Sequence, residues 1–309
     1  MWAYIVKRIL TAVPLFAVTT FISFTLTNYS PKDIAVSVLY SSGVPEMTDE
    51  MIELTITELG LDKPFLTRYW DWLKGCMSFD FGISYVYKKP VKDIIFPSLI
   101  NTMQLALASI LFIIILSLSL GILCVKYEGS FFDRALRGVM FLLNAMPAYW
   151  IGTLLIWGIS VELNLLPTSG KEGAASFILP VFVLSLNYYS YYLRLIRGEM
   201  IRNSHENYVS YGRSCGLKER VLIKHILKNS LETAVAAFFL AIPGLLAGTV
   251  VVENLFAWPG IGRTCVLAIF RQDIPIIQAY VVILAVSFIT FNLFADIVNA
   301  AINPRLRGN

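Results

Sequence analysis

Charged and titratable residues gather in one passage of the chain, YVSYGRSCGLKERVLIKHILKNS at 208–230. It holds five lysines and arginines, a central glycine and His225, which is one of two histidines in the chain. An imidazole binds metals and relays protons, but we expect His225 to be a helix-surface or packing residue. The chemistry that this passage predicts is that of a basic surface that another molecule binds.

Sequence patterns of catalysis are missing from the chain. It has no GxxxxGK[ST] phosphate-binding loop and no HExxH, and its apolar segments hold no Ser–His or di-aspartate pair. Its four cysteines show no CxxC spacing, so we expect inert thiols; whether Cys76 and Cys265 form a disulfide is left open. We expect no enzymatic activity, catalytic residue, metal site or cofactor in this chain.

The composition indicates an integral membrane protein. The 309 residues are 57% hydrophobic and 15% charged, with a mean hydropathy of +0.67, whereas soluble domains carry about 25% charged residues. The net charge of +4 reflects the basic loops of such a protein, so it predicts no binding of nucleic acid.

Six segments are long and apolar enough to cross a bilayer, which takes about 20 residues. The sequence therefore predicts an all-α, polytopic membrane protein with six transmembrane helices. These are at 9–28, 101–125, 138–161, 177–196, 231–252 and 276–301. We divide the chain into a first segment and helix (1–28), an extracytoplasmic helical loop (29–100) and a transmembrane core (101–309).

The basic residues predict the orientation. With six spans both termini share a side, and 15 of the 25 lysines and arginines lie on that side. Seven of the other ten lie in the loop 29–100, which is too long to steer topology. We expect both termini in the cytoplasm and the loop 29–100 outside.

Two segments outside the spans carry local signals. In the outer loop, Thr48 is expected to cap one helix, and a second helix after Pro64 is expected to bury Phe65, Tyr69, Trp70 and Leu73. We interpret this loop as a small helical cap with a solvated surface.

The second such segment is 253–275, which contains a Trp-Pro-Gly turn. We expect Trp258 to anchor at the membrane interface. The following run TCVLAIF is too short to span, so it predicts a surface or re-entrant helix.

The passage 203–230 predicts a helical elbow on the cytoplasmic side. A short helix over 203–214, capped by Asn203 or Ser204, is followed by a turn at Gly216. Glu206 suits the positive end of that helix. A second helix from Lys218 continues into the fifth span, so the elbow projects where a soluble partner can bind it.

The order Tyr208-Val209, Gly216-Leu217 and Lys224-His225 resembles the coupling loop of ATP-binding-cassette (ABC) importer permeases. Over its whole length the chain resembles the B-type permease of peptide and nickel importers. The pieces that carry this resemblance are LGLDKPFLTRYWDWL (59–73), FDFGIS (79–84), MPAYWIG (146–152), LPTSG (166–170), ENLFAWPGIGR (253–263) and NPRLR (303–307).

Two features depart from the family. Ser210-Tyr211-Gly212 replaces the acid-Ala-Ala opening of the loop, and the spacing from Gly216 to His225 is one residue shorter than in many peptide permeases.

The resemblance implies a type I importer permease in the cytoplasmic membrane of a prokaryote. Its partners would be a second homologous permease, two ATPases that bind ATP and magnesium, an extracytoplasmic binding protein and membrane lipid. The residues implied to couple to the ATPases are Asn203, Glu206, Tyr208, Val209, Tyr211, Arg213, Gly216, Leu217 and His225. The substrate-binding residues stay unknown.

Three interpretations of the function stay open: two differ in cargo, and the third differs in the type of transporter. The motifs look more like nickel and metallophore permeases than peptide permeases, so we expect a transition metal, carried as a chelate. A bare metal ion would favour imidazole or thiolate ligands in the pathway, and both histidines lie in the elbow. A di- or oligopeptide importer is the alternative. A stand-alone secondary transporter is more distant, because it would carry an ionisable residue at mid-membrane and the predicted spans show none.

Overall fold

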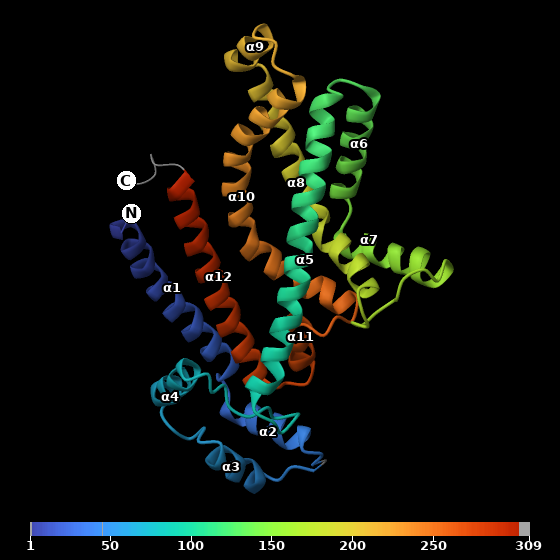
Figure 1. Ribbon diagram of the computed structural model, residues 1–309. Helices are drawn as coiled ribbons and strands as arrows, with labels where there is room; N and C mark the ends of the chain where they lie inside the picture. The colour runs from blue at the N-terminus through green and yellow to red at the C-terminus, as the bar shows by residue number, and fades with distance from the viewer. Residues whose placement is uncertain (1, 45, 303–309) are drawn as a thin grey trace. The chain divides into compact units, whose positions relative to one another are not determined.

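The computed structural model describes residues 2–44 and 46–302, and these form helices joined by turns, without a β-strand among them. This confirms the all-α prediction (Figure 1). In chain order the helices are α1 (Trp2–Thr27), α2 (Pro31–Ser41), α3 (Asp49–Glu58), α4 (Phe65–Met77), α5 (Val91–Lys126), α6 (Phe131–Ala145), α7 (Ala148–Leu155), the π-helix η1 (Ile156–Glu162), α8 (Ala175–Ser204), α9 (Asn207–Ser214), α10 (Glu219–Leu255), α11 (Ile261–Phe270) and α12 (Ile274–Ile302). The NPRLR motif at 303–307 lies outside the described residues.

The helices form two compact units. One unit takes in residues 104–257 and the end of α12, and the other takes in residues 2–103 and 258–293. α5 and α12 contribute to both units, so neither unit is a continuous stretch of chain.

Within residues 2–44 and 46–302, four helical segments are long and apolar enough to cross a membrane. They are Leu10–Thr27, Val91–Lys126, Ala237–Leu255 and Ile274–Val298. A fifth span exists if the bent pair Phe131–Ala145 and Ala148–Glu162 counts as one. The predicted span 177–196 lies in α8, which has 30 residues, but its apolar stretch covers only Ala175–Leu186.

The predicted span at 138–161 is interrupted at Pro147, where the chain bends sharply. α6 ends at Ala145, and the segment that follows is bent from it by 103°. Met146 has φ −99° and ψ 139°, the extended conformation that a following proline imposes. The helix then restarts at Ala148 with Pro147 as its N-cap residue.

The outer helices α3 and α4 begin where their sequence signals predict, but α4 buries fewer side chains than predicted, since Phe65 and Leu73 are only half-buried. Thr48 caps α3 by accepting a hydrogen bond from the Met51 amide, as predicted. α4 begins after Pro64, as predicted, and buries Tyr69. Trp70, however, is 55% exposed. It is one residue, or about 100°, past Tyr69 on the helix, so the two cannot share a buried face.

Ser84 and Trp258, from the motifs at 79–84 and 253–263, make buried contacts within the second unit. Asp273 is fully buried and accepts hydrogen bonds from the Ser84 hydroxyl and from the Tyr85 amide, the latter at 3.1 Å. Trp258 is also fully buried, and its Nε1 donates to the Asn101 carbonyl at 3.0 Å. The prediction that Trp258 anchors at the membrane interface is therefore wrong, because the indole is packed against the start of α5.

All four cysteines are free. Cys76 and Cys265 are buried in α4 and α11, and they do not form a disulfide with each other. Burial, with a contribution from the Asp80 carboxylate, raises the pKa of the Cys76 thiol to about 12. Since the thiolate is the reactive form, Cys76 is inert at neutral pH.

Candidate functional site: the elbow and its anchor

The elbow stands at the end of the long helices α8 and α10 (Figure 1). The fourth predicted span continues as α8 to Ser204, because no proline interrupts residues 197–204. The predicted helix over 203–214 therefore starts too early. The short helix is α9, and its N-cap residue is Glu206, whose side chain makes no capping bond.

Asn203 therefore lies in the last turn of α8 and is not a cap. Its Nδ2 donates to the Glu199 carbonyl at 2.8 Å and to the Ser230 hydroxyl at 3.1 Å. Since Ser230 belongs to α10, this side chain ties together the two helices that carry the elbow.

The turn at Gly216 is confirmed. Its φ is +75°, a conformation that glycine adopts without strain. The Leu217 amide donates to the Gly212 carbonyl at 3.0 Å, and the Gly216 amide donates to the Arg213 carbonyl at 2.9 Å. These two bonds are the Schellman pattern that ends a helix at a glycine. The turn thus fixes the direction in which the chain leaves α9 for α10.

The inner face of α9 packs tightly on its neighbours. Val209 is fully buried in a cluster with Ile196 and Met200 of α8 and Ile226 of α10. A Cβ on Gly212 would lie 2.7 Å from Leu222 Cδ2, so a larger residue here would require the Leu222 side chain to shift. The packing role of Gly212 is not among the predictions made from the sequence. Gly212 follows the apolar Val209 by three residues, which places both on the same helical face. This spacing was the sequence signal that could have indicated its packing role.

The outer face of α9 and its turn is open to solvent. Tyr211 is 73% exposed and Leu217 46%, and Tyr208 and His225 are also exposed. Arg213 forms a surface ion pair with Glu219 at 2.9 Å across the turn. Of the nine predicted coupling residues, Val209 and Asn203 hold the elbow together and Gly216 shapes it. The aromatic, leucine, arginine and histidine side chains remain available to a partner.

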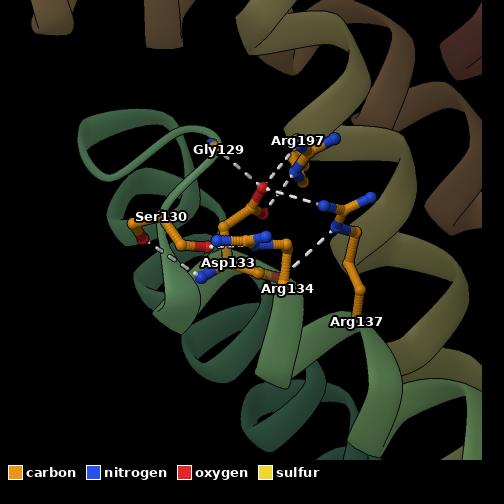
Figure 2. A network of polar contacts seen from close by, with 6 residues as sticks. All are labelled: Gly129, Ser130, Asp133, Arg134, Arg137 and Arg197. Atoms are coloured by element: carbon orange, nitrogen blue, oxygen red, sulfur yellow. Dashed lines mark hydrogen bonds and ion pairs between the residues drawn. The ribbon is translucent and has the colours of Figure 1, made fainter.

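A buried ion pair joins α6 to α8 in the same unit. Asp133 is fully buried, and Arg197 donates to it with Nε at 2.8 Å and with Nη2 at 2.9 Å (Figure 2). Arg137 adds a contact at 3.3 Å, and the Gly129 amide donates at 3.4 Å. The Asp133 amide in turn donates to the side chain of Ser130, the N-cap of α6.

This ion pair holds α6 against α8, since breaking a buried ion pair by removing one partner is costly. α8 in turn leads directly into the elbow. In the sequence, Arg137 and Arg197 count only as positive-inside charges, and the ion pair with Asp133 is not predicted. The Ser130-x-x-Asp133 spacing at a helix start marks the acid as a first-turn residue, but nothing local indicates its partner 64 residues later.

A cavity of about 380 Å³ lies beside this ion pair. Its polar lining includes Arg137, Arg194, Arg197 and Asn144, and its apolar lining includes Met140. Among the described residues, no group of three histidine, cysteine or acidic side chains is arranged to hold a metal ion. The cavity is thus a basic hollow at the α6–α8 contact.

Two family descriptions match the sequence. Residues 113–308 match the binding-protein-dependent transport system inner membrane component, and residues 1–106 match the N-terminal part of such membrane components.

Curated relatives match over almost their whole length. The chain is 44% identical to the metal-staphylopine import system permease protein CntB of Staphylococcus aureus (strain NCTC 8325), over 99% of both chains. It is 35% identical to the oligopeptide transport system permease protein AppB of Bacillus subtilis (strain 168), again over 99% of both. It is 33% identical to the glutathione transport system permease protein GsiC of Escherichia coli (strain K12), with the same coverage.

Proposed function

The chain belongs to the family of binding-protein-dependent transport system inner membrane components, and from that premise we propose that it is the permease of an ABC importer for a chelated transition metal. It is a multi-pass membrane protein of a prokaryote. In this proposal it pairs with a second permease, binds two ATPases at its elbow and receives cargo from an extracytoplasmic binding protein. ATP and magnesium are held by the ATPases.

The observation that carries the proposal is the construction of the elbow. α9 is locked by Val209 and Gly212 on its inner face, yet it presents Tyr211 and Leu217 to solvent. Aromatic side chains contribute strongly to protein interfaces when a partner covers them. A rigid, exposed helix of this kind transmits force, whereas a loose loop would absorb it.

The mechanism follows from what the elbow is attached to. Closure of the ATPase dimer would push α9, and α9 is packed directly on α8 and α10. The Asp133–Arg197 pair extends the moving body to α6. Rigid-body rotation of these helices against the partner permease would then switch the pathway between its inward-open and outward-open states.

The proposed orientation places the elbow and both termini in the cytoplasm. It rests on the excess of lysine and arginine in the short loops on that side. The outer helices α2–α4 then face the compartment in which a binding protein delivers cargo.

The cargo is proposed from the relatives and from the chemistry of the chain together. CntB is named for a metal bound to staphylopine, and a chelated metal has its coordination sites already filled. The pathway then needs no imidazole or thiolate ligands of its own. A peptide cargo is the second candidate, because AppB and GsiC, which match over the same length, are named for oligopeptides and glutathione.

Uptake by the purified complex in liposomes tests the cargo. We expect labelled nickel or a related metal to accumulate with ATP only when a metallophore-type chelator and the binding protein are present. A labelled peptide serves as the matched alternative. Peptide uptake that no metal chelate competes with, together with no metal accumulation, would replace the metal proposal by the peptide one.

A further inference from the structure

The outer helix α4 presents different side chains on three sides. One side, which holds Tyr69, Trp72 and Cys76, is packed against the protein. The opposite, polar side holds exposed Thr67, Asp71 and Lys74. A third side lies between these two and is apolar.

Leu66, Trp70 and Met77 form this third side, which we term the apolar stripe. They are 60%, 55% and 77% exposed. With 3.6 residues per turn, these positions fall within about 40° of one another around the helix. Three large apolar side chains in one line on a helix surface indicate contact with something other than water.

The place of α4 along α1 indicates what that contact is. The Tyr69 hydroxyl lies 3.0 Å from the Thr20 hydroxyl. The rings of Phe21 and Phe24 make edge contacts with Phe65 and Tyr69, at centroid distances between 5.4 and 5.9 Å. In Figure 1, α4 lies beside the end of α1 that leads into α2.

These contacts place α4 near the end of the apolar segment of α1. Thr20 and Phe24 belong to the apolar segment Leu10–Thr27. At a rise of about 1.5 Å per residue they lie roughly 4–10 Å inside its end. Helices that lie in the plane of a membrane interface bury their apolar side about 5–10 Å below the headgroups, so the two depths agree.

We propose that α4 is an in-plane membrane helix whose apolar stripe inserts into the lipid beside α1. Phe21 and Ile22 of α1 are also exposed at this level, so α1 presents apolar side chains to the same surroundings. Thr67, Asp71 and Lys74 then lie at the headgroups, and Trp70 takes the interfacial position that tryptophan favours in membrane proteins. The outer loop is thus partly a membrane anchor, where its composition alone suggested a solvated cap. This inference depends on insertion of α1 and not on the cargo.

Spin labels test the proposal in the full-length chain, purified with its accompanying subunits and reconstituted in phospholipid nanodiscs. The background is Cys215→Ser, because Cys215 is exposed and the other three cysteines are buried. Single cysteines at Leu66 and Met77 are compared with matched controls at Thr67 and Lys74. We expect the first pair to collide frequently with oxygen and rarely with chromium oxalate, and the control pair to show the reverse.

Two results would overturn the proposal. Equal access of chromium oxalate to all four labels would place the stripe in water. Labels at Leu66 and Met77 that are immobilised and shielded from both reagents would mean that a protein partner covers the stripe.

Tryptophan fluorescence gives a second readout that needs no label on α4. Lipids brominated near the headgroup should quench part of the wild-type emission, and the Trp70→Phe variant should lack that part. An unchanged quenched fraction in Trp70→Phe would contradict insertion.

Discussion

Replacing Asp133 with alanine is expected to lower the free energy of unfolding of the chain by about 3–5 kcal/mol, the typical cost of breaking a buried ion pair. The reason is geometric. Arg197 donates two hydrogen bonds to this carboxylate, at 2.8 and 2.9 Å, and would be left with a poorly solvated charge beside α6. Folded domains are stable by only about 5–15 kcal/mol, so we also expect poor assembly and loss of uptake. Chemical unfolding in lipid–detergent micelles measures the first effect, and ATP-driven uptake measures the second.

Arg134→Ala is the matched control for this variant. Arg134 is the next residue of α6, is exposed, and bonds to the Ser130 carbonyl rather than to the Asp133 carboxylate. We expect a loss within about 0.5 kcal/mol, as for other surface changes. A double-mutant cycle with Arg197→Ala should show a coupling energy of roughly 0.5–3 kcal/mol. If Asp133→Ala behaves like Arg134→Ala, the ion pair does not hold α6 to α8.

Gly216→Val is expected to uncouple ATP hydrolysis from uptake or to prevent assembly with the ATPases. A valine at φ +75° costs roughly 1–3 kcal/mol in backbone strain. No atom lies within 4 Å of the position of its Cβ, so the cost comes from the backbone and not from a clash. α9 and α10 would then meet at a changed angle. The measurement is the number of cargo molecules imported per ATP hydrolysed.

Gly216→Asn separates strain from side-chain size. Asparagine tolerates the left-handed region far better than a β-branched residue does, and the open space accommodates it. We expect this variant to transport close to the wild-type rate. Equal transport by the valine and asparagine variants would mean that the turn geometry is not part of the coupling.

The parts of the fold that could be predicted are those encoded by neighbouring residues. Gly216 predicted the turn because only a residue that accepts positive φ fits there, and Thr48 predicted the start of α3 by its capping side chain. The apolar runs predicted α1, α5, α10 and α12, although α5 begins at Val91, ten residues before the predicted span. The first turns of α5 run through Pro97 and bury Val91 and Ile95 in a core cluster of the protein.

The missed features depend on contacts between distant residues or on local breaks that hydropathy averages away. The apolar pattern at 138–161 runs straight through Pro147, yet the helix bends by 103° there. The burial of Trp258 depends on Asn101, which lies 157 residues earlier. The partnership of Asp133 with Arg197 likewise becomes visible only when α6 and α8 are side by side.

The central claim is that the elbow is the cytoplasmic surface that the ATPases hold, and Cys215 tests it most directly. It lies in the elbow and is exposed, while the other three cysteines are buried. The measurement is the rate at which a membrane-impermeant maleimide labels Cys215 in sealed right-side-out and inside-out vesicles, with and without bound ATPases. We predict labelling only from the cytoplasmic face, slowed at least about tenfold by the ATPases, as expected for a site at the centre of a protein interface. Labelling from the outer face, or a cytoplasmic rate that the ATPases leave unchanged, would contradict the account.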